Sequence, residues 1–315
     1  MCENNVRMTL MLKLKKLRES RATVWVVSLI CFIVLMIVTP TIPQSQEYHD
    51  FADQRNFFGV PNTLNVISNF PFLIIGVIGL VLCLRGNYFD LSLQGEVWSW
   101  AIFYVGVAAT AFGSAYYHLK PDDARLVWDR LPMTIAFTSI MSVFIIERWD
   151  ERAGTISLFP LLMIGIVSIA YWRYFDDLRP YALVQFAPCI AIPAMTILLP
   201  PKYTHSVYWL WAAGFYLLAK IEEAEDKPIY KLTHYIISGH TLKHLCAAMV
   251  PVFLTIMLSR RTVQIERQSL FETWKVSLKM VLVRGEDGQG WFKWKYSRLT
   301  TEADTNSSCS EAISV

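Results

Sequence analysis

The stretch IISGHTLKHLCAAMVPVFLTIML, residues 236–258, decides the fold class of this chain. It is long and apolar enough to cross a bilayer as a helix, which needs about 20 mostly apolar residues. Near its start, two histidines, His240 and His244, interrupt the apolar run. An ionisable side chain inside a membrane span is costly and typically marks a functional site. This one stretch therefore predicts both a membrane span and a site within it.

Seven more stretches share this apolar character, and short polar segments separate them. They lie at about 23–40, 64–84, 98–119, 128–147, 155–171, 181–199 and 205–219. The 315 residues are 54% apolar and 17% charged, whereas soluble domains are about 45–50% apolar and about 25% charged. These values exclude a disordered chain, a disulfide-stapled secreted module and an ordinary soluble enzyme. We predict an all-α, polytopic membrane protein with a seven-transmembrane-helix core and one extra N-terminal transmembrane helix.

The charges that flank the spans predict the orientation of the chain. Six basic residues precede the first span, and nine follow residue 259. Basic flanks stay in the cytosol, so both termini are expected there. The expected organisation is a basic cytosolic N-tail 1–22, a signal-anchor helix 23–40, a lumenal segment 41–62, a seven-helix core 63–258 and a basic, partly disordered cytosolic C-tail 259–315. A cleaved signal peptide is the alternative for the first helix.

Net charge and cysteine spacing narrow the partners. The net charge of +3 is small and the basic residues gather near the chain ends, so no nucleic acid partner is expected. The six cysteines show no CxxC or paired spacing, which predicts free thiols without a disulfide framework or a thiolate metal site. The lipid bilayer is the expected environment, and the sequence does not define an oligomeric state.

Four ionisable side chains from three spans are expected at the same face of the membrane. His118 ends the third span, Asp129 opens the fourth, and His240 and His244 open the last. Alternate spans run in opposite directions, so all four positions reach the lumenal face. Residues far apart in the sequence are thereby predicted to meet in one site.

The spacing of the histidines indicates a metal site. His240 and His244 are four residues apart and share one helix face. With His118 they would supply the three imidazoles of a catalytic zinc site with an open fourth position, and Ser114 lies one turn before His118. Histidines that only bond neighbouring helices are the alternative. The chain lacks an HExxH motif, so Asp129 is the better candidate for a general base.

At these positions the sequence resembles the alkaline ceramidase (phytoceramidase-like) family of the CREST superfamily of membrane hydrolases. The resemblance rests on Ser114-x-x-x-His118, on Asp129 eleven residues later, and on His240-x-x-x-His244. Asn65-Val66-Ile67-Ser68-Asn69 opens the first core helix in a similar way. The resemblance covers roughly residues 48–258. It implies a seven-helix core that cleaves the amide bond of ceramide or phytoceramide. The products would be a sphingoid base and a free fatty acid.

The resemblance also implies a role for each of these side chains. His118, His240 and His244 would bind zinc (Zn2+). Asp129 would deprotonate the zinc-activated water and then protonate the leaving amine, and Ser114 would help to stabilise the oxyanion. Zinc lowers the pKa of bound water to about 7, a carboxylate can relay the proton, and a hydroxyl can stabilise developing negative charge. An endomembrane location, in the endoplasmic reticulum or Golgi, with the site near the lumenal face is also implied.

The segment before the first core helix departs from the family pattern. Animal members carry a calcium site there, and Asp50, Asp53, Asn56 and Asn62 are the candidate calcium (Ca2+) ligands here because they offer oxygen atoms. Their spacing does not superpose on the family pattern, and Arg55 is placed to neutralise one carboxylate. A solvated lumenal loop paired by its own arginine is the alternative.

Three other functions are compatible with part of these sequence features. A GPI-anchor lipid-remodelling hydrolase of the same superfamily would keep the metal and change the substrate. A seven-helix receptor would use zinc structurally and place its core in the opposite orientation. A transporter would need ionisable groups that continue across the bilayer, whereas these gather at one face. The charged run 222–227 is expected to be a solvated lumenal loop.

Overall fold

The structure is a computed structural model that describes residues 30–85, 88–91, 93–264 and 269–271. The expected N-tail, the first part of the signal anchor and most of the expected C-tail lie outside the described residues. Residues 30–38 are helical. The elements that follow are η1 (Gln46–His49), α2 (Thr63–Ile67), α3 (Phe70–Leu84), α4 (Gln94–Leu119), α5 (Asp123–Arg148), α6 (Glu151–Phe175), α7 (Arg179–Leu198), α8 (Tyr208–Ala224), α9 (Asp226–Leu232) and α10 (Gly239–Arg260).

Six helices in the described part are long and apolar enough to cross a membrane. They are α2 with α3, α4, α5, α6, α7 and α10. This confirms the predicted all-helical, multi-pass membrane class. The seven-plus-one count stays a prediction, because α8 has only 17 residues and the structure describes only the end of the first expected span.

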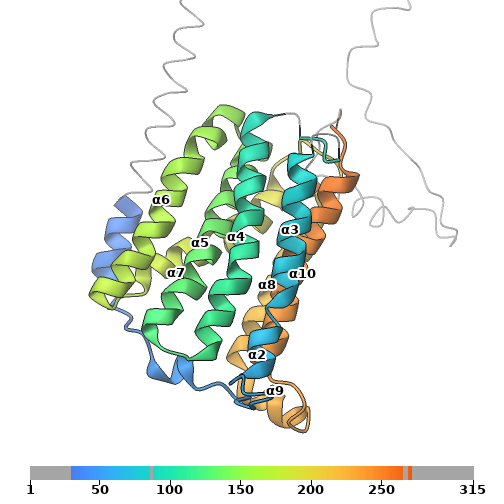
Figure 1. Ribbon diagram of the computed structural model, residues 1–315. Helices are drawn as coiled ribbons and strands as arrows, with labels where there is room; N and C mark the ends of the chain where they lie inside the picture. Colours follow the sequence, from blue (N-terminus) through green and yellow to red (C-terminus); the bar gives the residue numbers. More distant parts are fainter. Residues whose placement is uncertain (1–29, 86–87, 92, 265–268, 272–315) are drawn as a thin grey trace, which may run out of the picture.

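The helices form a bundle in which α4 packs between α3 and α5 (Figure 1). Helix α6 covers α5, and α10 packs against α8 and α3. Gly113 permits a close approach of α4 to α5, since a Cβ atom there would lie 1.9 Å from the carbonyl oxygen of Trp128. The site residues of α4 and α5 are thereby held against each other.

Two of the helices begin earlier than the sequence analysis expected. Asp122 accepts a hydrogen bond from the backbone N–H of Arg125 at 2.8 Å, and Asp150 accepts one from Ala153 at 2.7 Å. Such N-caps satisfy the free amides of a first helical turn. Because α5 starts at Asp123, Asp129 lies in the second turn of the helix and does not open it.

The first expected core helix is divided into α2 and α3. Helix α2 ends at Ile67 and α3 begins at Phe70, and Pro71, which has no backbone N–H, lies in the first turn of α3. Ser68 and Asn69 occupy the break, and both side chains are buried. The break therefore directs two polar side chains into the bundle.

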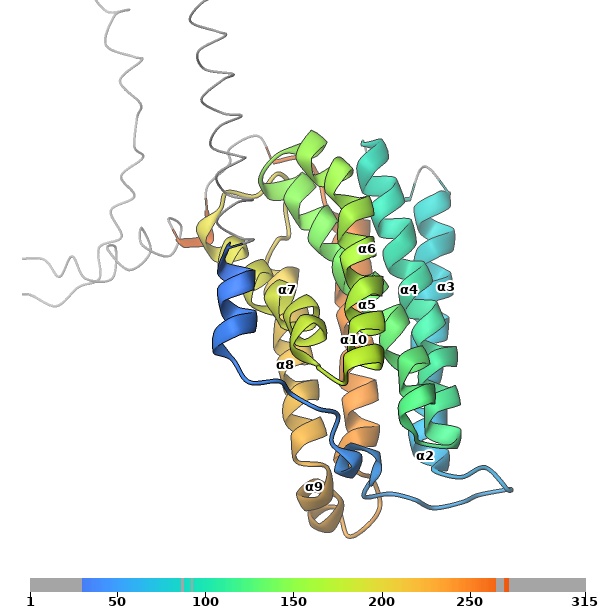
Figure 2. The same ribbon diagram turned by 90° about the vertical axis from the view of Figure 1, so that its left-hand side faces the viewer.

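The chain from residue 39 to 58, called the strap here, crosses the end of the bundle where α4 ends and α10 begins (Figure 2). This end is called the histidine end. The backbone N–H of Leu178 donates to the carbonyl of Ile42 at 2.8 Å, and that of Gln44 donates to Asp176 at 3.0 Å. Hydrogen bonds from Arg179 hold the pKa of Asp177, in the same contact region, below its ordinary value. The strap is thus fixed to the connection between α6 and α7.

A cluster of buried charges closes the opposite end of the bundle. The guanidinium of Arg261 donates to Glu147 at 2.6 Å and to Glu96 at 3.2 Å. The hydroxyl of Tyr203 donates to Glu96 at 2.7 Å, and its ring centre lies 3.9 Å from the guanidinium carbon. All four side chains are buried. The cluster joins α4, α5, the segment before α8 and the chain just after α10, and the sequence analysis did not predict it.

Candidate metal centre

Three histidines from two distant helices converge at the histidine end. One ring nitrogen from each of His118, His240 and His244 lies within 4.8 Å of the others. The ring centres are 4.9 to 5.0 Å apart, and all three side chains are buried. Among the described residues, this is the group of His, Cys, Asp and Glu side chains arranged to hold a metal ion. The predicted meeting of these residues is therefore found.

The hydrogen-bonding state of these rings fits a metal ion. Both ring nitrogens of His118 and Nε2 of His244 are buried and have no hydrogen-bond partner. Leaving a buried polar atom unpaired costs about 1–3 kcal/mol. A divalent metal would use these nitrogen lone pairs, and three imidazoles are the ligand set of many catalytic zinc sites. The residues present therefore fit zinc.

Hydrogen bonds from the break between α2 and α3 orient one of the rings. Ser68 donates its proton to the carbonyl of Asn65 at 3.2 Å, and its Oγ lies 2.7 Å from Nδ1 of His244. With this single proton directed to Asn65, the serine oxygen would accept a hydrogen bond from the N–H at Nδ1. The tautomer that results leaves the lone pair of Nε2 free for a metal.

Backbone contacts fix the two other ligand positions. The side-chain amide of Asn62 donates to the carbonyl of His118 at 2.9 Å. Asp226 accepts a hydrogen bond from the backbone N–H of His240 at 2.7 Å and another from Ala52 in the strap at 2.8 Å. Asp226 therefore ties the strap to the first turn of α10, where a carboxylate is favoured by the helix dipole.

An aromatic side chain from the strap covers the histidines. The ring centre of Phe51 lies 4.7 Å from that of His118 and 4.5 Å from that of His240. Its side chain is only 4% exposed. Phe51 thus separates the histidines from the outside of the bundle at this end. The sequence analysis missed this role because nothing in the local sequence predicts how the strap folds back.

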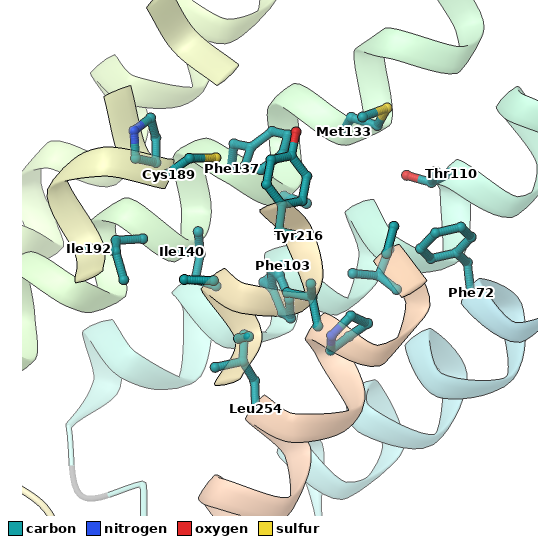
Figure 3. Close-up of a pocket in the computed structure, with 18 of the residues that line it drawn as sticks. Phe72, Phe103, Thr110, Met133, Phe137, Ile140, Cys189, Ile192, Tyr216 and Leu254 are labelled. Atoms are coloured by element: carbon teal, nitrogen blue, oxygen red, sulfur yellow. The ribbon is translucent and has the colours of Figure 1, made fainter. Parts of the chain in front are cut away.

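The predicted general base and oxyanion donor lie together at the head of a cavity. Ser114 and Asp129 are both buried and line the cavity with His244. The hydroxyl of Ser114 lies close to the carboxylate of Asp129. Below them the walls are mainly apolar, with side chains from six helices pointing inward (Figure 3). The cavity therefore joins polar reactive groups to a compartment for hydrocarbon.

A partly buried lysine, Lys243, also belongs to the site, and the sequence analysis did not include it. Lys243 lines the cavity, and its Nζ lies 2.7 Å from Glu223 and 3.3 Å from Nε2 of His240. Glu223 also accepts hydrogen bonds from Lys220 at 2.7 Å and from the Tyr48 hydroxyl at 3.0 Å. The sequence could have indicated Lys243 as a site residue, because it is a charged residue between the two histidines of one span.

The expectation of a solvated loop over residues 222–227 is wrong for much of this run. Glu222 and Glu223 belong to the last turn of α8 and are mostly buried. Asp226 begins α9 and bonds the strap and α10. Two of these acidic side chains have hydrogen-bond partners inside the protein. Lys220 and Lys243 donate to Glu223, and backbone N–H groups donate to Asp226.

Three of the four candidate calcium ligands have separate partners in the structure. Asp50 pairs with Lys227 at 2.6 Å, which holds the pKa of this carboxyl below its ordinary value. Asp53 pairs with Arg55 at 2.6 Å; burial raises the pKa of Asp53, but the hydrogen bonds from Arg55 outweigh burial and lower it. Asn62 bonds His118, as described above, and Asn56 is exposed. The arginine pairing that was the alternative to calcium is therefore present.

Comparison with known proteins identifies the family of this chain. A search of curated proteins finds no match for the chain. A model of the protein family described as Ceramidase matches residues 59–238. The matched region is more than half of the chain and contains Ser114, His118 and Asp129, and it ends two residues before His240. On this evidence the chain belongs to the ceramidase family.

Proposed function

We propose that this protein is a zinc-dependent membrane hydrolase that cleaves the amide bond of ceramide or phytoceramide. One observation carries the proposal: three buried histidines converge, two of them with unpaired ring nitrogens, and His244 lines an apolar cavity together with Asp129 and Ser114. Membership of the ceramidase family supports an amide-bond hydrolase with a lipid substrate. The products would be a sphingoid base and a free fatty acid.

Each side chain of the site has a separate proposed role in the reaction. His118, His240 and His244 would hold zinc, which when bound acts as a Lewis acid and lowers the pKa of water to about 7. Asp129 would accept a proton from the attacking water and deliver it to the leaving amine nitrogen. Ser114, whose hydroxyl lies close to Asp129, would turn its single proton to the carbonyl oxygen as negative charge develops there.

The surroundings of the site suit a lipid substrate. The cavity runs from the polar groups into the apolar interior of the bundle, so a hydrocarbon chain can stay out of water while its amide meets the histidines. Phe51 covers the histidines on the side of the strap. We infer that the substrate reaches the centre from the membrane side.

We propose a membrane arrangement with one more core helix than the six candidate spans, a signal anchor and a defined orientation. Helix α8 would complete a seven-helix core at 63–258, and residues 30–38 would be the end of a signal anchor. The histidine end would face the lumen of the endoplasmic reticulum or Golgi, with both termini in the cytosol. Calcium has less support than zinc, because Asp50 and Asp53 each already have a cationic partner.

The test is fatty-acid release by the full-length chain purified in detergent, with zinc quantified in the same sample. Ceramides, phytoceramides and glycerolipid esters would be offered in parallel. We expect amide cleavage with about one zinc per chain. The double variant His240→Ala, His244→Ala should lose both zinc and activity. The matched control is His234→Ala, because His234 is exposed and outside the triad.

Two results would overturn this proposal. Full zinc content in the double histidine variant would show that the triad is not the metal site. Release of fatty acid from glycerolipid esters, with every ceramide left intact, would assign the protein to lipid remodelling.

A further inference from the structure

The cavity below the reactive groups has small side chains along part of its wall, where Phe72, Phe137 and Tyr216 also lie, and large ones at its end. Alanines from three helices line its middle, namely Ala136, Ala212, Ala213 and Ala247. At the end away from the histidines lie Phe103, Trp209 and Leu254, and Figure 3 shows Phe103 and Leu254 among the side chains that line it. The cavity is therefore open along its length and blocked at its floor.

Helix geometry gives the depth of this cavity. On α10 it extends from His244 to Leu254, and on α4 from Ser114 to Phe103. At a rise of 1.5 Å per residue, both distances are about 15 Å. This is about half of the roughly 30 Å hydrocarbon thickness of a bilayer. A chain that fills the cavity would thus end near the middle of the membrane.

The floor is supported from below and cannot yield easily. Trp209 is 2% exposed. Its ring centre lies 5.0 Å from that of Phe144, which it meets edge to face, and 6.0 Å from that of Trp100. Protein interiors are close-packed, so a side chain held on its far side by two other aromatic rings has little room to move. The end of the cavity is therefore a fixed boundary.

We propose that Trp209, together with Phe103 and Leu254, sets the longest fatty-acyl chain that the enzyme accepts. This inference rests on the proposed amide hydrolysis. The acyl chain is the occupant because it is bonded directly to the carbonyl carbon that is attacked. The sphingoid chain begins beyond hydroxyl groups, whereas the wall below Thr110 and Asn69 offers apolar side chains, including Val107 and Met133.

The experiment uses the variant Trp209→Ala and the matched control Trp211→Ala. Trp211 lies two residues further along α8 and is 56% exposed on the outside of the bundle. Both variants and the unmodified protein would be given ceramides that share one sphingoid base and differ in acyl length. A second set would share one acyl chain and differ in base length. The readout is kcat/KM for each substrate.

We expect Trp209→Ala to accept longer acyl chains, with the ratio of kcat/KM for long over short chains raised about 10-fold. Trp211→Ala should keep the length profile of the unmodified protein. The reverse change is Ala213→Leu, which narrows the cavity one turn above Trp209 and should shift the profile to shorter chains. It keeps the inference testable if Trp209→Ala fails to fold.

The outcomes separate this inference from the proposed function. Unchanged acyl-length profiles in Trp209→Ala and Ala213→Leu, with ceramide still cleaved, would overturn the assignment of the floor alone. A shift that follows base length instead of acyl length would overturn the choice of occupant. If the unmodified protein cleaves no ceramide, the failure belongs to the proposed function.

Discussion

The Oγ atom of Ser68 lies 2.7 Å from Nδ1 of His244, although 176 residues separate the two in the sequence. The same hydroxyl lies 3.2 Å from the carbonyl of Asn65, and if it donates there, the serine oxygen accepts a hydrogen bond from the imidazole N–H. The contact therefore selects one tautomer and one orientation of a proposed metal ligand. Groups in this position commonly change metal affinity by about 10–100-fold when removed.

Replacing Ser68 by alanine should weaken zinc binding by about 10–100-fold without abolishing it, because the imidazole remains but loses its fixed orientation. Competition with a chelator of known affinity would measure the change. Ser259→Ala is the control, since Ser259 is exposed near the opposite end of α10. Equal zinc affinity in the Ser68 variant and in this control would show that the hydrogen bond does not support the metal.

Asp129→Asn should retain zinc and lose turnover by about 10²–10⁴-fold, because the amide keeps the size of the side chain but cannot accept the proton. Ser114→Ala should also retain zinc, with kcat lowered by up to about 10²–10³-fold through loss of one donor. Zinc content and kcat would be measured on the same preparations. An Asp129→Asn variant with ordinary kcat would remove Asp129 from the proton transfers.

Phe51→Ala should speed the loss of zinc to a chelator, because it opens the covered side of the histidines to water. We expect the release rate to rise about 10-fold, the lower end of the change in metal affinity expected from disturbing such a support. Phe58→Ala is the control from the same strap, since Phe58 is fully exposed. Identical release rates in both variants would mean that Phe51 does not shield the centre.

Arg261→Ala should lower the free energy of unfolding by about 3–5 kcal/mol, because Glu96 and Glu147 lose the guanidinium that they share in a buried site. Thermal unfolding in detergent would show this as a lower Tm, with zinc content unchanged at low temperature. The neighbouring Arg260 is exposed, so Arg260→Ala should leave Tm nearly unaltered. A small effect at Arg261 would indicate that the cluster is not structural.

Asp177 should make the attachment of the strap sensitive to acid. Its pKa is below the ordinary value in the folded protein because of hydrogen bonds from Arg179, so the unfolded chain binds the proton more readily. The stabilisation is therefore complete above about pH 4, the unfolded value, and is lost as pH falls through the folded value. The Tm difference between the unmodified protein and Asp177→Asn should be constant from pH 5 to pH 8 and should shrink towards pH 3. A difference that grows as pH falls would contradict this.

The metal centre could be predicted from the sequence because its signals are local. His240 and His244 share a helix face by spacing alone, and the alternation of spans places His118 at the same end. The early start of α5 was also within reach, because Asp122 is a favoured N-cap residue followed by helix-forming residues. The position of Asp129 in the second turn would have followed from it.

Other parts of the site depend on tertiary contacts. Ser68 belongs to the N-x-x-S-N pattern of the resemblance, but the sequence does not predict its contact with His244. That contact exists because the chain breaks between α2 and α3, before Pro71, and this break packs on α10. From the sequence, Glu223 was expected to be a solvent-exposed charge. Its pairing with Lys243 depends on the packing of α8 against α10, which the local sequence does not predict. Glu96 and Arg261 each flank a span, which is ordinary for charged residues, and 165 residues separate them.

The positions of the three histidines also impose an order of assembly on the chain. A ribosome delivers α4 to the membrane long before α10, and domains generally form from the N-terminus onward during synthesis. A nascent chain that stops before residue 240 holds a single member of the triad and cannot gather the other two. If the triad binds zinc as proposed, capture of the ion by all three rings would follow insertion of the last described helix and would connect an early part of the polypeptide to a late one. Zinc retention would thus serve as a report that biosynthesis of the bundle has been completed.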